Sequence, residues 1–197
     1  MLLSVILAFI IGLIPSELGI LKFISWKENK KINELILFKN KTPINEFVLS
    51  IIIPAIIAVF AFIFIKPIEV KLWDKLVFLP YIFKLENTNF LEINHLKITI
   101  ILSFIFGDFL APFVEEIYFR GYLLPRMGVF EKFAPFVNTL IFSIYHFFTP
   151  RQIITRIIGI TPMVYSVWYK KDIKIGIIMH CLLNFAGDLG MLMLLFG

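Results

Sequence analysis

Three short clusters of ionisable and polar residues lie within apolar runs in the second half of the chain, where such side chains are costly and tend to be functional. They are Glu115–Arg120, Phe142–His146 and His180–Asn184. Together they supply a carboxylate base, a second proton-handling group and two potential hydrogen-bond donors for an oxyanion. These are the groups needed to attack a peptide carbonyl with water, without a nucleophile from the chain.

Helical geometry separates the roles of these residues. Glu116 and Arg120 are four positions apart and share a helix face, so an ion pair between them is expected. Glu115 points about 100° away from that face and lacks this partner, which makes it the candidate general base. His180 and Asn184 are also four positions apart, so both side chains can reach one point in a helix bundle.

The composition indicates that these clusters lie in a membrane. Of the 197 residues, 59% are hydrophobic, and the mean hydropathy is +0.90. Several apolar runs reach the roughly 20 residues that a membrane helix needs. The expected spans are Leu2–Leu21, Phe47–Ile65, Ile98–Phe119, Phe133–Phe148, Ile153–Tyr169 and Ile173–Phe196. We therefore expect one all-α membrane domain over residues 1–197, a polytopic bundle of about six to eight transmembrane helices around a polar cavity.

The charges set an expected orientation and limit the partners. The loop Lys22–Lys41 holds six lysines and is expected to be cytoplasmic, with both termini outside, although Lys66–Lys97 carries five. The short apolar stretch Leu72–Phe83 contains charges and is expected to be interfacial or re-entrant. The net charge of +5 reflects basic residues dispersed in short loops, so the lipid bilayer is the expected partner and nucleic acid is not. The single cysteine, Cys181, excludes an internal disulfide.

The three clusters resemble the motifs of a known protease family. The stretch from Ala111 to Pro125 is similar to the EExxxR signature of the CAAX-processing and bacteriocin-processing (CPBP) protease family. Phe142–His146 resembles its FxxxH motif, and His180–Asn184 its HxxxN motif. Order and approximate spacing also match, over about Ile98 to Leu195.

The resemblance implies an intramembrane glutamic endopeptidase with no metal and no cofactor. Glu115 would activate water together with His146, and His180 and Asn184 would stabilise the oxyanion. Glu116 and Arg120 would chiefly support the structure of the site.

The substrate implied by this resemblance is a membrane-associated peptide. It is either a prenylated protein C-terminus or a peptide of bacteriocin maturation or self-immunity. The chain is rich in Ile, Lys and Asn, as is common for AT-rich and often prokaryotic genomes. This composition favours the bacteriocin-related substrate, and we expect a multi-pass protein of a prokaryotic cell membrane.

Other interpretations of the same residues remain open at the level of sequence. Ser143 is three residues from His146, but no third group that would orient a Ser–His pair is evident. Glu115, His146 and His180 also match the types of zinc ligand, although an HExxH pattern is missing. The alternative for His180 and Asn184 is that they form interhelical hydrogen bonds only, as polar residues in membrane helices often do.

Further alternatives concern other residues and other classes of protein. Asp108 and Asp188 each follow a glycine and allow a paired-aspartate protease, which leaves the histidines unexplained. Arg156 lies inside an apolar run, where it either caps the mouth of the site or extends to the interface. A transporter with a proton relay fits the buried charges, but no internal repeat is visible. A non-catalytic self-immunity or scaffold protein that retains the site is the main alternative function.

Overall fold

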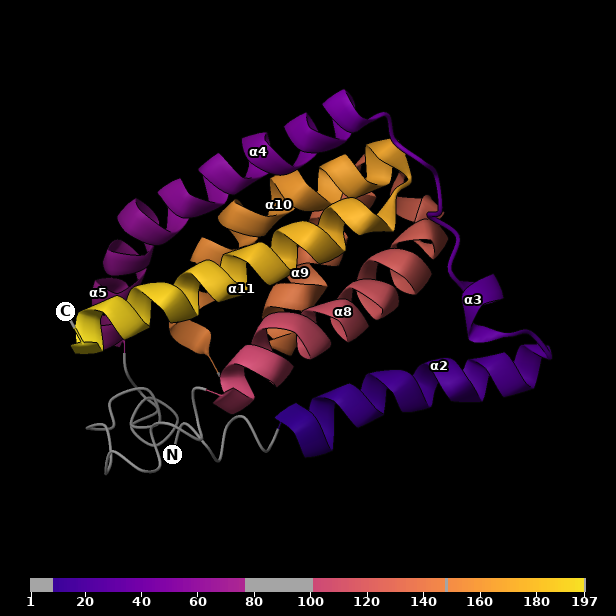
Figure 1. Cartoon of the computed structure of the whole chain (residues 1–197), viewed down its shortest axis with the longest axis horizontal. Coiled ribbons are helices and arrows are strands. Elements are labelled where there is room, and N and C mark those ends of the chain that lie inside the picture. Colours follow the sequence, from indigo (N-terminus) through magenta and orange to yellow (C-terminus); the bar gives the residue numbers. More distant parts are fainter. Residues whose placement is uncertain (1–8, 77–100, 148, 197) are drawn as a thin grey trace.

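The structure is a computed structural model that describes residues 9–76, 101–147 and 149–196 (Figure 1). Nearly all of these residues are helical, and the described part contains no β-strand. Lys39 and Asp172 form an isolated antiparallel β-bridge. The predicted all-α fold is confirmed.

The helices follow the apolar runs of the sequence closely. The π-helical turn η1 (Phe9–Leu13) leads directly into α2 (Ile14–Glu28), which ends at Asn29 in the left-handed conformation (φ 51°). The other elements, in chain order, are α3 (Ile32–Leu35), α4 (Ile44–Phe60), η2 (Ala61–Ile65), α5 (Lys66–Leu76), η3 (Ser103–Leu110), α8 (Ala111–Glu116), η4 (Ile117–Leu123), η5 (Leu124–Arg126), η6 (Gly128–Phe133), α9 (Ala134–Tyr145), η7 (Pro150–Gln152), α10 (Ile153–Lys170) and α11 (Ile173–Phe196).

Two helices in the described residues are long and apolar enough to cross a membrane, namely Ile44–Lys75 and Ile173–Gly190. A third span results if Ser103–Arg126 and Gly128–Tyr145, which bend by 116° relative to each other, count as one. The expected number of six to eight transmembrane helices stays a prediction, because the structure does not describe residues 1–8, 77–100, 148 and 197. Of the predicted interfacial stretch Leu72–Phe83, only the first five residues are described, and they end α5.

Helix α10 is central to the bundle and contacts α4, α9 and α11. Its crossing with α4 is close because Gly159 carries no side chain: a Cβ there would lie 3.3 Å from the Cα of Ala58. Helix α2 runs along the opposite edge of the molecule from α4, beside α8 (Figure 1). The three sequence motifs are thus carried by helices that pack between these two edges.

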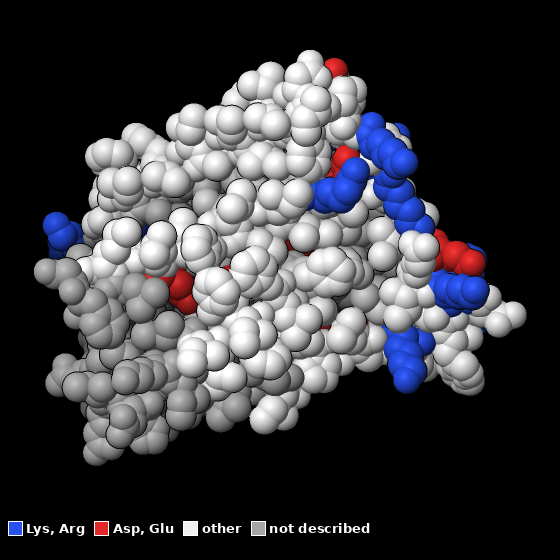
Figure 2. Space-filling view, in the orientation of Figure 1, with Lys and Arg blue, Asp and Glu red and all other residues white. Residues whose placement is uncertain are grey.

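Most of the visible lysine and arginine side chains gather at one end of the bundle (Figure 2). Backbone hydrogen bonds tie the lysine-rich loop to the α10–α11 turn there, from Asn40 N to Lys171 O at 2.9 Å and from Ile173 N to Phe38 O at 3.2 Å. Helix α2 starts and α11 finishes at the opposite end (Figure 1). The loop and the turn therefore lie at the same end of the bundle. The predicted order of spans also places both of them on one side of the membrane. That this side is cytoplasmic stays a prediction.

Candidate active site

The two adjacent glutamates end the short helix α8, which lies between the π-helical segments η3 and η4. Glu115 is 4% exposed and Glu116 is completely buried. Widened π-helical turns often occur at functional sites, because they alter the register in which side chains leave the helix. The local backbone and the burial both mark this segment as the centre of the candidate site.

Glu116 joins two of the sequence motifs. Its Oε1 atom lies 3.0 Å from Nη1 of Arg120 and 3.0 Å from Nδ1 of His180. The predicted i,i+4 ion pair is therefore present. Arg120 is fully buried, and its guanidinium carbon lies 4.1 Å from the centre of the Phe142 ring. The geometry of the contact between Arg120 and Glu116 is that of an ion pair and not of a hydrogen bond. Within the described residues, the three guanidinium nitrogens of Arg120 form no hydrogen bond of good geometry.

Glu115 faces the two histidines. Its Oε1 atom is 3.6 Å from Nε2 of His146, and its Oε2 atom is 3.8 Å from Nε2 of His180. Both separations are longer than a direct hydrogen bond. A small reacting group can therefore contact the carboxylate and an imidazole together, and catalytic contacts commonly tighten when substrate binds.

Hydrogen bonds on the far side of each imidazole fix its orientation. Nδ1 of His146 lies 2.9 Å from the carbonyl oxygen of Phe142, and Nδ1 of His180 lies 3.0 Å from the Glu116 carboxylate. Because both partners are acceptors, each Nδ1 carries a proton and donates it. The Nε2 atoms are thereby presented to Glu115.

Asn184 lies one turn beyond His180 on α11. Its amide nitrogen donates a hydrogen bond of 2.9 Å to the carbonyl oxygen of Gly107 in η3. The structure thus brings Glu115, His146 and His180 together, whereas Asn184 is engaged with the backbone of a neighbouring helix. An amide nitrogen carries two protons, so the second remains available as a donor.

The structure also places the residues of the alternative interpretations. The buried Ser143 hydroxyl forms no hydrogen bond to His146. Asp188 accepts a hydrogen bond of 2.5 Å from Ser103, and it is close enough to the buried Asp108 to interact with it electrostatically. Among the described residues, no three His, Cys, Asp or Glu side chains are arranged to hold a metal ion.

Arg156 is buried within the bundle. It is 8% exposed, and its Nη2 atom donates a hydrogen bond of 2.8 Å to Thr149. It is also close enough to Glu115 and His146 to interact with them electrostatically. The sequence singled out Arg156 as an arginine within an apolar run. The sequence alone did not decide whether its side chain lies near the site or extends to the interface.

Gly176 is a support of the site that the sequence did not single out. A Cβ at this position of α11 would lie 2.5 Å from Oε2 of Glu116 and 3.2 Å from Val167. The absence of a side chain at position 176 therefore gives the Glu116 carboxylate its place between Arg120 and His180.

Substitution of Gly176 by alanine is expected to displace Glu116 and to lower turnover by up to about 100-fold, as small misplacements of catalytic groups do. Turnover per folded molecule is the measurement. Gly187→Ala on the same helix is the matched control, because a Cβ there meets nothing within 4 Å. Equal turnover of the two variants would show that the position of Glu116 does not matter for the reaction.

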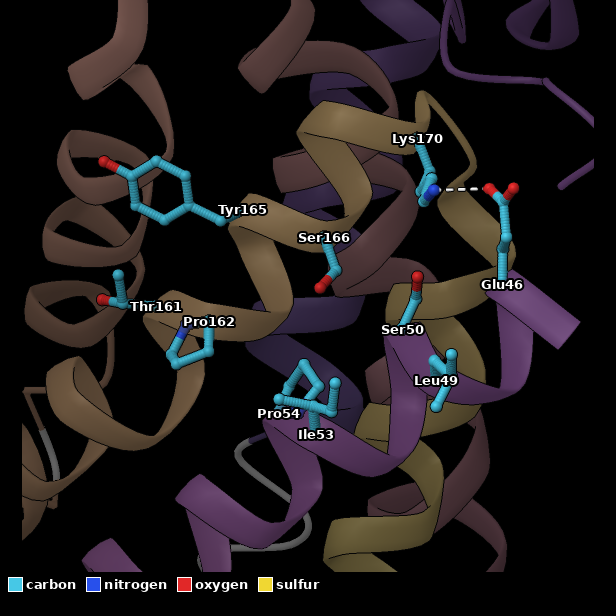
Figure 3. A pocket seen from close by; sticks show the side chains of 10 residues that line it. All are labelled: Glu46, Leu49, Ser50, Ile53, Pro54, Thr161, Pro162, Tyr165, Ser166 and Lys170. Atoms are coloured by element: carbon cyan, nitrogen blue, oxygen red, sulfur yellow. Dashed lines mark hydrogen bonds and ion pairs between the residues drawn. The ribbon is translucent and has the colours of Figure 1, made fainter.

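A groove in the described structure lies apart from this cluster. It has a volume of about 510 Å³ and runs between α4 and α10, where Ser50, Thr161, Tyr165 and Ser166 line it and the Lys170–Glu46 ion pair of 2.5 Å closes one end (Figure 3). None of the motif residues borders it. We place the candidate chemistry at the buried Glu–His cluster, because the cluster holds the groups that handle protons.

Comparison with known families agrees with the motifs. Residues 97–186 match the family model described as Type II CAAX prenyl endopeptidase Rce1-like. No curated protein and no solved structure matches the chain. The matched segment contains every residue of the three motifs and ends before the last ten residues of α11.

Proposed function

We propose, from the match of residues 97–186 to the family model described as Type II CAAX prenyl endopeptidase Rce1-like, that this chain is a glutamate-dependent intramembrane endopeptidase. It is a single multi-pass domain of a prokaryotic cell membrane, with a protease-like core at residues 98–195. Its substrate is a membrane-associated or prenylated peptide. The observation that carries the proposal is the buried Glu115 carboxylate, which faces the Nε2 atoms of His146 and His180 at 3.6 and 3.8 Å.

The reaction uses water as the nucleophile. Glu115, assisted by His146, takes a proton from water while the oxygen attacks the carbonyl carbon of the scissile peptide bond. The resulting oxyanion accepts hydrogen bonds from His180 and Asn184. The proton held by Glu115 and His146 then passes to the nitrogen of the scissile bond, the carbon–nitrogen bond breaks, and a carboxylic acid and an amine leave.

The geometry around His180 adds a requirement to this mechanism. Because its Nδ1 atom donates to Glu116, its Nε2 atom donates to the oxyanion only when the ring carries both protons. The Glu116 carboxylate lies against both that ring and Arg120, so it stabilises the positive charge of the ring, and Arg120 helps to hold Glu116 in place. Glu116 and Arg120 thus support the site through His180.

Cleavage of a peptide panel by the purified protein tests the function. We expect hydrolysis of at least one membrane-associated peptide by the wild type, with prenylated and unprenylated versions compared. A protein that binds panel peptides but cleaves none would contradict the proposal and favour a non-catalytic self-immunity or scaffold protein.

The proposed mechanism uses only groups of the chain and water. Treatment with phenanthroline is therefore expected to leave the rate of hydrolysis unchanged, as measured in the same assay. Loss of activity on chelation, followed by recovery on addition of zinc, would instead assign Glu115, His146 and His180 as metal ligands.

A further inference from the structure

Helix α2 lies outside the segment that matches the family model, and it buries one carboxylate. Its inward face consists of Ile14, Glu17 and Leu21, at positions i, i+3 and i+7. Ile14 packs with Ala111 and Val114 of α8. A helix that only anchored the chain in lipid would carry an apolar residue at the middle of this face, because a buried carboxylate is costly.

Glu17 is 2% exposed, and neither of its carboxylate oxygens forms an aligned hydrogen bond within the described residues. The hydroxyl of Tyr145 lies beside it and is likewise without an aligned partner there. Glu17 is also close enough to interact electrostatically with Arg120, whose guanidinium nitrogens lack aligned hydrogen bonds. One acceptor and two kinds of donor therefore lie near one another in the interior of the bundle.

Both neighbours of Glu17 contact the candidate catalytic groups. Tyr145 immediately precedes His146, and the two rings pack edge to face with centroids 5.5 Å apart. Arg120 pairs with Glu116, which in turn holds His180. Glu17 is thus connected to both histidines, one through Tyr145 and the other through Arg120.

We propose that Glu17 is a positioning residue of the active site, whose carboxylate accepts the Tyr145 hydroxyl and shares Arg120 with Glu116. This inference rests on the proposed protease function and adds to it that the N-terminal helix completes the site. The Tyr145 contact fixes the end of α9 that carries His146. The Arg120 contact keeps the guanidinium where it supports Glu116 and His180.

Three variants separate positioning from a purely structural role. Glu17→Leu removes the acceptor and places an apolar side chain on a packed helix face. Arg120 keeps Glu116 as its partner in this variant, so no buried cation is left without a counter-charge. We expect Glu17→Leu to keep or raise the melting temperature but to lower kcat about 10- to 100-fold, with KM little changed. Glu17→Asp is expected to recover part of kcat, and Glu28→Gln, an exposed acid on the same helix, is expected to behave as wild type.

Wild-type kcat in Glu17→Leu, or a fall in kcat that only follows a fall in melting temperature, would overturn the proposal. The contact with Tyr145 has a readout that does not need turnover. Glu17→Leu and Tyr145→Phe are expected to shift the melting temperature non-additively, because each of them removes the same hydrogen bond. Additive shifts would overturn the proposal even if the wild type is active. Non-additive shifts in a wild type that cleaves nothing would support the contact and count against the protease function alone.

Discussion

Glu115→Gln is expected to abolish hydrolysis while the protein remains folded and extractable from the membrane. Glutamine has the size and shape of glutamate but cannot accept the proton of the attacking water. Positioned acid–base groups typically contribute about 100- to 10,000-fold to the rate, so the residual rate is expected to fall at least this far. The change leaves the Glu116–Arg120 pair in place.

Glu116→Gln is the matched control, because it changes the adjacent residue in the same way. Glu116 holds Arg120 and His180 at 3.0 Å each, so this variant is expected to lower the melting temperature more than Glu115→Gln does. Its turnover is expected to fall as well, through the loss of the His180 contact. Near-full turnover in Glu115→Gln would remove Glu115 from the mechanism and leave the histidines without a carboxylate base.

The local part of the site was predictable from sequence because it depends on helix periodicity. Glu116 and Arg120 are i,i+4 neighbours, and the structure contains their ion pair at 3.0 Å. The apolar runs likewise predicted the extents of α9, α10 and α11 to within a few residues. Spacing within one helix is fixed by the backbone, so a sequence states it directly.

The contacts between helices could not be predicted in this way. Gly176 and Glu116 are sixty residues apart, and nothing in the sequence around the glycine indicates that a carboxylate occupies the space beside it. Glu17 belongs to no motif, and its burial depends on how α2 packs against α8. The π-helical segment η3 also changes which backbone groups face α11, and this decides the partner of Asn184.

His180→Ala and Asn184→Ala are each expected to reduce turnover by about 100- to 1,000-fold, with little change in KM. This is the typical loss when one donor to an oxyanion is removed, since its contribution arises only in the transition state. His180 already faces Glu115 at 3.8 Å, and Glu116 holds it in that orientation. For Asn184, the hydrogen bond to Gly107 orients the amide and leaves its second proton for the oxyanion.

The opposing interpretation of Asn184 is that its hydrogen bond to Gly107 is its whole purpose. Polar contacts between membrane helices contribute about 0.6 kcal/mol on average, so in that case Asn184→Ala would lower the melting temperature slightly and leave turnover per folded molecule intact. The decisive measurement is turnover and melting temperature of this variant side by side. Collapsed turnover in a nearly stable protein supports the oxyanion role. Normal turnover in a destabilised protein would make Asn184 a link between η3 and α11 and leave His180 as the donor.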